Sequence, residues 1–405
     1  MATEAPAPAR RRFIAELLDV HAEELGYLWR RRRRSLSSPT LTLRDLADLN
    51  ERIEAHTQGL LVARDALREH LGPALAGSER DEVFASAYPL LRTSDPKLAR
   101  LVVTAFGEAA AMRLAGLRDA LCMAGIALTE PAMRQFLEHG DAPHAAAASA
   151  VLASHKRLES TPARLATLAG DADPEVATVA WHVVATLGNA EITIERTYVD
   201  AIKGKHDGVR DAAVGAAVWR GEFWVPGVIR RLAEDGDPVG LGWFAAIAGA
   251  DAAAVMQTAL SKPITGVSRS RIAARFGHPG LMDLVLEEMK STDPLTASAA
   301  GAAFTRFTGV DLPGQRTKLP VKVGDDDFER EFVDDVWVPD APSAQRAWEQ
   351  KLTTWRNGAR WCRGCEISAR LTRDDRQRID LEALGDFGAR AALAGERVLS
   401  PPPIV

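Results

Sequence analysis

Apolar residues in the stretch 171–190, DADPEVATVAWHVVATLGNA, recur at the spacing of one helical face. Asp-Pro opens the stretch and suits a helix start, because the Asp side chain can cap free amides and Pro has no amide to satisfy. Gly188 suits the left-handed residue that ends many helices. The apolar face consists of Val176, Ala180, Val183 and Leu187.

The same pattern recurs along the chain. Asp141, Asp173, Asp207 and Asp237 follow one another at intervals of 32, 34 and 30 residues. Second helical segments such as VPGVIRRLAED, 225–235, lie between the copies. A period near 30 built from two short helices predicts an all-α, HEAT-like α-solenoid of antiparallel helix pairs. Helices should begin at or just after Asp95, Asp173, Asp237 and Asp293.

Other repeat and nucleotide-binding folds fit the pattern less well. The ankyrin signature and the tetratricopeptide pattern of Trp, Gly and Tyr are missing from the sequence. No glycine-rich loop follows a predicted strand, which argues against a nucleotide-binding α/β fold.

The flanks of the array have a different character. Residues 13–34 are typical of one helix, and Thr42 with Asp45 resembles a capping box. A helical face follows at Leu46, Leu49, Ile53, His56 and Leu60. We predict a disordered 1–9, an N-terminal helical hairpin cap over 10–75, the repeat array over 76–312, an acidic linker or loop over 313–344, and a C-terminal helical segment over 345–405.

The acidic linker carries eight acids and one Arg between Asp325 and Asp340, and its part from Gly324 to Ala344 holds two prolines, Pro339 and Pro342. Repulsion among the carboxylates disfavours compaction. We expect an exposed, irregular loop that rests Phe332 and Trp337 on the array. Limited proteolysis should cut this loop first and leave a fragment that ends near Leu312.

Composition and charge narrow the class of protein. The chain has 405 residues, with 50 Lys and Arg against 55 Asp and Glu, so its net charge is −5. Such a balance offers no general attraction to nucleic acid. The sequence contains three cysteines, no secretory h-region and no apolar run long enough to span a membrane. We therefore expect a cytoplasmic, soluble protein.

Several stretches carry a resemblance to a known family. They are HAEELGYLWRRR, LRDLADLNERIEAHTQGLLVA, DEVFASAYPLL, AAGAAFTRFTGVDL, RAWEQKLTTW and GARWCRG, and together they span nearly the whole chain. The sequence resembles an uncharacterised proteobacterial family of HEAT-repeat proteins with members in myxobacteria and pseudomonads. The family has no assigned activity or catalytic residues. Some members lie near type VI secretion genes, so the resemblance implies a link to secreted effectors.

Two motifs could carry chemistry. WCRGC places Cys362 and Cys365 in a CxxC pattern, but a zinc site needs a second pair of ligands, and Cys122 is far away in sequence. We interpret this motif as an ordinary loop-to-helix segment that binds no metal. His21 and His56 lie in the family-like stretches, and we expect packing or hydrogen bonding there rather than catalysis. The sequence predicts no catalytic residue, metal or cofactor.

The candidate binding residues are arginines and tryptophans. Arg30, Arg31 and Arg32 belong to a basic run that could contact phosphates or an acidic partner; the alternatives are a solvated helix end or a contact with the chain's own acidic loop. Trp181, Trp219 and Trp243 fall on successive repeats, either as partner-binding residues or as fillers of gaps between helices.

A protein–protein interaction scaffold is the function that these features favour, since a solenoid offers a long surface. Its partner would be another protein, and we do not expect it to bind a membrane or nucleic acid. Two enzyme alternatives stay open. One is a HEAT-like DNA glycosylase, which uses aromatic residues and an Asp on a concave surface, and the other is a repeat-type lyase.

Overall fold

A computed structural model of the chain describes residues 15–158, 162–187, 195–262, 266–319, 335–355, 358–367 and 370–396. The described residues fall into two compact units. Unit 1 contains those up to Arg34 and those of Ala47–Val183, whereas unit 2 contains Ser35–Leu46 and those of Val184–Pro403. Over these residues the fold is all-α, as predicted, apart from two small strand pairs.

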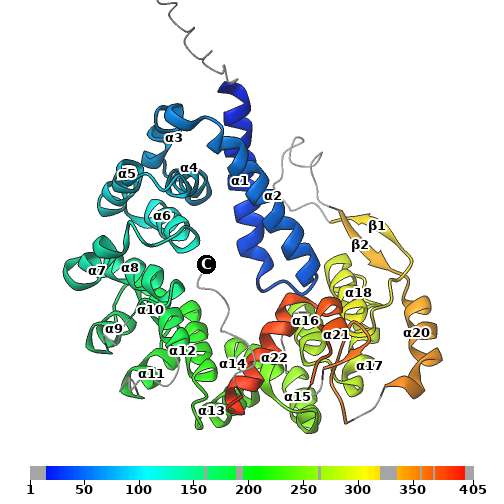
Figure 1. The fold of residues 1–405 in the computed structure, drawn as a ribbon. Coiled ribbons are helices and arrows are strands. Elements are labelled where there is room, and N and C mark those ends of the chain that lie inside the picture. The colour runs from blue at the N-terminus through cyan, green and yellow to red at the C-terminus, as the bar shows by residue number, and fades with distance from the viewer. Residues whose placement is uncertain are drawn as a thin grey trace, which may run out of the picture. The chain divides into compact units, whose positions relative to one another are not determined.

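Unit 1 is built from short helices after a long hairpin (Figure 1). Its elements are α1 (Ala15–Ser35), α2 (Leu43–Leu61), η1 (Arg64–Ala66), α3 (Leu67–Leu71), η2 (Pro73–Ala76), α4 (Arg80–Arg92), α5 (Pro96–Gly107), α6 (Ala111–Met123), α7 (Glu130–His139), α8 (Ala142–Ser154), α9 (Pro162–Ala169) and α10 (Pro174–Thr186). The last residue of α1, the first turn of α2 and the end of α10 belong to unit 2. The capping box before α2 is confirmed: the Thr42 amide donates to Asp45 Oδ2 across 2.8 Å, and the Asp45 amide donates to Thr42 Oγ1 across 3.4 Å.

Alternate helices of unit 1 pack side by side. Helix α4 contacts α6, and α6 contacts α8, so these three form one row, while α5, α7 and α9 lie in a second row (Figure 1). Small alanine side chains let α8 approach its neighbouring helices closely, and Ala145–Ala148 are all buried. One continuous apolar core runs from Leu18 of α1 to Leu152 of α8.

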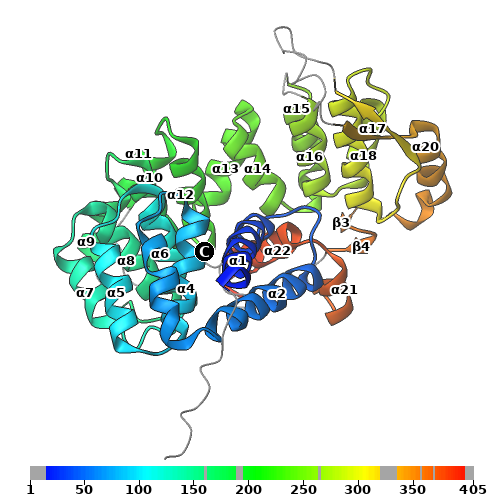
Figure 2. The same ribbon diagram turned by 90° about the horizontal axis from the view of Figure 1, so that it is seen from above.

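Unit 2 continues with paired helices and ends in a mixed segment. Its elements are α11 (Glu195–Ile202), α12 (Asp207–Trp219), α13 (Val225–Asp235), α14 (Pro238–Ile247), η3 (Ala250–Ala252), α15 (Ala253–Leu260), α16 (Gly266–Phe276), η4 (Pro279–Leu281), α17 (Met282–Glu288), α18 (Pro294–Thr308), β1 (Gly314–Lys318), β2 (Asp335–Pro339), α20 (Ala341–Gln350), η5 (Leu352–Thr354), β3 (Trp361–Cys362), β4 (Cys365–Glu366), α21 (Arg373–Arg378) and α22 (Leu381–Leu393). Helices α12, α14, α16 and α18 form the row of this unit by successive contacts, and α22 packs against α12 and α14 (Figure 2).

The predicted helix starts are confirmed. Helices α5, α10, α14 and α18 each begin at the Pro that follows the expected Asp. In each case the Asp carboxylate accepts a hydrogen bond from a first-turn amide, the physical basis of the prediction. Gly188, proposed to end α10, lies outside the described residues.

The 313–344 segment differs from the irregular loop that we expected. Strands β1 and β2 pair antiparallel, with Arg316 opposite Trp337, and α20 begins at Ala341. Strand β2 contacts α18, and Gly301 provides the room, because a Cβ there would come within 2.5 Å of the Pro339 ring. The strand-favouring residues of Asp335–Pro339 stabilise β2 more than repulsion among the carboxylates destabilises it at this end of the segment. Trp337 is 50% exposed. Phe332 and the rest of 320–334 lie outside the described residues.

Candidate functional site

The basic end of α1 is bound to carboxylates of unit 1. Arg30 Nε donates to Asp81 Oδ2 across 2.7 Å, and Arg33 Nη2 donates to Asp81 Oδ1 across 2.5 Å. Arg32 is buried, with its guanidinium over the Trp29 ring and its Nε bonded to Asn50. The proposal that Arg32 binds a partner is therefore wrong, because its side chain is part of the hairpin core. Arg31 is exposed.

Asp119 of α6 is the acceptor that ties these helices together. Its fully buried carboxylate accepts two hydrogen bonds of 2.8 Å from Arg80, one of 3.1 Å from Arg118 and one of 3.1 Å from the Trp29 indole. The Trp29 ring also stacks on Phe84, with centroids 4.0 Å apart. A buried carboxylate is tolerated because it is paired and fully hydrogen-bonded. Helix α1 is thereby fixed to α4 and α6.

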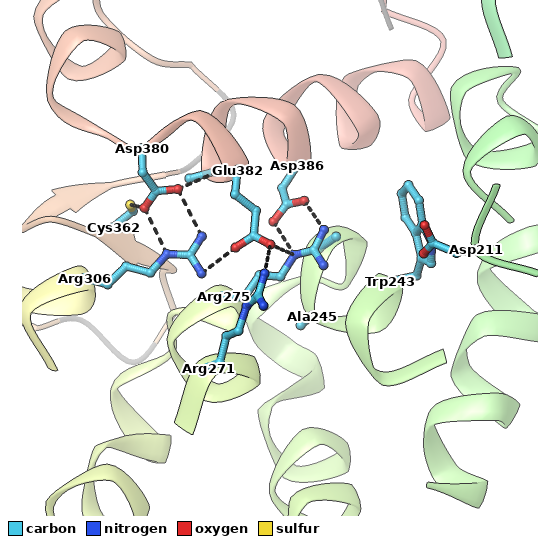
Figure 3. Close-up of polar contacts among 12 residues, drawn as sticks. Asp211, Trp243, Ala245, Arg271, Arg275, Arg306, Cys362, Asp380, Glu382 and Asp386 are labelled. Atoms are coloured by element: carbon cyan, nitrogen blue, oxygen red, sulfur yellow. Dashed lines mark hydrogen bonds and ion pairs between the residues drawn. The ribbon is translucent and has the colours of Figure 1, made fainter. Parts of the chain in front are cut away.

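The three candidate tryptophans differ in their exposure. Trp181 is fully buried, so it is not a partner-binding residue, and it fills space between small residues of the repeats instead. Trp219 and Trp243 are half-buried. Trp243 packs on Gly215 of α12, since a Cβ there would lie 3.0 Å from the indole ring. The Trp243 Nε1 donates to Asp211 Oδ1 across 2.8 Å (Figure 3).

A set of ion pairs binds α22 to the row of unit 2. We call Arg275, Arg306, Asp380, Glu382 and Asp386 the α22 network (Figure 3). Arg275 of α16 donates to both oxygens of Asp386, across 2.9 and 2.7 Å. Arg306 of α18 donates to both oxygens of Asp380, across 2.9 and 3.1 Å, and lies 2.8 Å from Glu382. The row presents cations to an acidic helix.

Within the α22 network, the neighbouring arginines favour the ionised form of Asp386. Burial on its own raises the pKa of the Asp386 carboxyl, but the charge of Arg275 and its hydrogen bonds outweigh burial and hold the pKa below its ordinary value. Two-point pairing of a planar guanidinium with a carboxylate is also the geometry that best offsets the loss of water.

Arg360 binds helix ends rather than acids. Its buried guanidinium donates to the carbonyls of Ala245, Ala246 and Ala248 near the end of α14, and to those of Arg275 and Phe276 at the end of α16. A cation suits these carbonyls, which carry the negative end of the helix dipole. Burial, and then repulsion by Arg390, lower the pKa of Arg360.

The connection between α1 and α2 caps the N-terminal end of α22 within unit 2. The amide of Leu381 donates to the Leu41 carbonyl across 2.8 Å, and the amide of Glu382 donates to the Ser38 carbonyl across 3.1 Å. Arg363 Nη2 donates to the Thr40 carbonyl across 2.6 Å. Amide groups at the start of α22 therefore find partners in a segment more than 300 residues earlier in sequence.

The CxxC motif forms a hairpin turn, not the loop-to-helix segment that we expected. Cys362 pairs with Cys365 across β3 and β4, and the turn residues Arg363 and Gly364 have φ values of 49° and 72°. Positive φ at both positions defines a tight two-residue hairpin. Both thiols are free and buried, and burial raises the pKa of each. Thiols in this environment are poor nucleophiles at neutral pH.

His21 and His56 are brought together by α1 and α2. Their Nδ1 atoms lie 3.1 Å apart, with the rings edge to face at a centroid distance of 5.1 Å. Burial, and then the neighbouring His21, lower the pKa of His56. Among the described residues, no group of three or more His, Cys, Asp or Glu is placed to hold a metal ion.

We did not predict several of these residues from the sequence, namely Asp119, Arg275, Arg306, Arg360, Asp380 and Asp386. Most of their partners are 18 to 115 residues away along the chain; the near ones are Arg118, adjacent to Asp119, and the Ala383 amide, which donates to Asp380. Such distances leave no local periodicity to detect. The Asp-led start of α22 was the one available signal, since Asp380 also caps that helix by accepting from the Ala383 amide.

Two further findings bear on identity. In the part of the chain that the structure describes, none of the helices combines the length and apolar character needed to cross a bilayer. In comparisons with known proteins, no family model, no curated protein and no solved structure matches the chain significantly.

Proposed function

We propose that the protein is a HEAT-like solenoid that binds another protein through the faces of its helical rows. One observation carries the proposal: in each unit a helix from outside the repeats is bound to the row by buried, complementary charges. In unit 1, α1 brings Arg30 and Arg33 to Asp81, and Arg33 also lies 3.7 Å from Asp119. In unit 2, α22 brings acids to Arg275 and Arg306.

These two helices suggest the kind of partner. Both are amphipathic segments that bury apolar and charged side chains together against Ala-rich repeat helices. Helix-in-groove recognition uses such anchors. We propose that the partner presents a helical segment to the part of the row where Trp243 and Asp211 are accessible, because a half-buried indole is a common anchor at protein interfaces.

The cellular setting follows from the family resemblance and is part of the proposal. The protein would act in the cytoplasm, where its three cysteines stay reduced, and would handle effectors of a type VI secretion system. The −5 net charge supports a protein partner over nucleic acid.

The test is chemical cross-linking of the tagged protein in a type VI-positive bacterium, followed by identification of the cross-linked peptides. Wild-type protein should yield cross-links that map to α12 and α14, and Trp243→Ala should reduce them. Lys290→Ala, which alters an exposed ion pair after α17, serves as the matched control and should leave them unchanged. Equal capture by wild type and Trp243→Ala would contradict the proposed binding face.

The nucleic-acid-acting alternative has one observation in its favour. Trp243 and Asp211 place an indole and a carboxylate side by side on adjacent repeat helices. Direct titration with DNA at several salt concentrations separates the two functions. The scaffold predicts no salt-sensitive binding near physiological ionic strength, whereas tight binding that weakens steeply with salt would favour the enzyme.

A further inference from the structure

We propose that His21 and His56 form a binding site for a divalent transition-metal ion such as Zn²⁺, Ni²⁺ or Cu²⁺, with one imidazole nitrogen from α1 and one from α2. The two Nδ1 atoms share a hydrogen bond of 3.1 Å, and the metal ion would take the place of its proton. With metal–nitrogen bonds of about 2.0–2.1 Å, two nitrogens at this separation subtend roughly 100° at the ion. That angle lies between the square-planar and tetrahedral values, and imidazole suits these metals.

Gly59 makes this arrangement possible. A Cβ at position 59 would lie 2.6 Å from His21 Nε2 and 2.7 to 2.8 Å from two ring carbons. Glycine weakens the interior of a helix such as α2, and here it leaves the space that the His21 ring occupies. The Nε2 edge of the His21 ring lies over Gly59, and Nδ1 is the nitrogen that contacts His56.

The surroundings allow an ion to enter. Both histidines are half-buried rather than enclosed. Glu24 lies one turn after His21, and its negative charge favours the protonated form of His56. The ion pair of Glu24 with Arg52 spans 3.9 Å between two side chains that are 45% and 52% exposed. No third protein ligand is in place among the described residues, so this would be an open two-histidine site completed by water, unlike the closed four-ligand zinc site considered for the CxxC motif.

Isothermal titration of the metal-free, full-length protein with Zn²⁺ tests the site. We expect one Zn²⁺ per chain, with binding lost in His21→Ala and in His56→Ala. Gly59→Ala keeps both ligands but displaces the His21 ring, so it should weaken binding. His139→Ala removes a largely exposed histidine of α7 and should leave binding unchanged.

Nitrogen NMR of the histidine rings keeps the test valid if a variant fails to fold. In wild-type protein, Zn²⁺ should shift the Nδ1 signals of His21 and His56 and leave the other imidazoles unchanged. The proposal is overturned if wild type binds no stoichiometric Zn²⁺, if folded His21→Ala or His56→Ala still binds it, or if the shifts occur at other histidines.

Discussion

The indole of Trp29 donates a 3.1 Å hydrogen bond to the carboxylate of Asp119, which lies 90 residues later in the chain. Asp119 is fully buried, and the same carboxylate neutralises Arg80 and Arg118. Removing the carboxylate would leave two cations and an indole without their acceptor. In Asp119→Ala, the free energy of unfolding should fall by about 3–5 kcal/mol, the usual cost of breaking a buried ion pair. Urea denaturation monitored by circular dichroism measures it.

A matched exposed pair provides the control for Asp119. Lys290 and Glu287 form an exposed ion pair, so Lys290→Ala should leave the unfolding midpoint nearly unchanged. Equal effects from both variants would show that burial of Asp119 contributes nothing to stability.

Substitution of Trp181 and substitution of Trp243 should lower stability to different extents. Trp181 is fully buried, so Trp181→Ala leaves a cavity and should lower the free energy of unfolding by about 3–5 kcal/mol. Trp243 is half-buried, so Trp243→Ala loses one hydrogen bond, worth about 0.5–1.5 kcal/mol, and the packing on Gly215, and should cost less than Trp181→Ala. Thermal and urea unfolding of the two variants measures the difference. A larger loss of unfolding free energy for Trp243→Ala than for Trp181→Ala would contradict the complete burial of Trp181.

Arg360 should be intolerant of substitution. Its guanidinium donates hydrogen bonds to five backbone carbonyls, and no other side chain can donate to all five at once. Lysine keeps the charge but lacks the planar fork of donors. We expect Arg360→Lys to lower the free energy of unfolding by at least about 2 kcal/mol, because buried carbonyls lose their donors. Hydrogen exchange of α14 and α16 gives a local measurement, and unchanged protection would contradict the role.

Acid should destabilise the fold through Asp81 and Asp386. Burial raises the pKa of each, but the arginines bound to them lower it further, so both lie below the ordinary value of 3.8. The unfolded chain therefore binds protons at higher pH than the folded chain. Stability from these pairs is present above about pH 4–5 and is lost as pH falls through the folded pKa values. Urea unfolding at several pH values measures this; a pH-independent midpoint between pH 6 and 3 would contradict it.

Local chemistry made the helix starts predictable from sequence. An Asp followed by Pro meets its partners, the first amides of the helix, within two or three residues, and the outcome at Asp95 and Asp293 follows from that alone. The hairpin turn at Cys362–Cys365 had only half of a local signal, because Gly364 readily adopts the positive φ of a two-residue turn whereas Arg363 does not.

The ion pairs lacked such a signal. Arg275 and Asp386 are 111 residues apart, and nothing near either residue indicates the other. Strand β2 was missed for a related reason. The acidic composition around it dominated the prediction, whereas its pairing with β1 and its packing on α18 depend on residues elsewhere in the chain.

The most direct test of the account is a double-mutant cycle on Arg275 and Asp386, since it measures whether complementary charge binds an outside helix to a repeat row. The free energies of unfolding of wild type, Arg275→Ala, Asp386→Ala and the double variant are compared. We predict a coupling energy of about 1–3 kcal/mol, so that the double variant loses less than the two single variants together. Additive losses, with a coupling energy near zero, would contradict the claim.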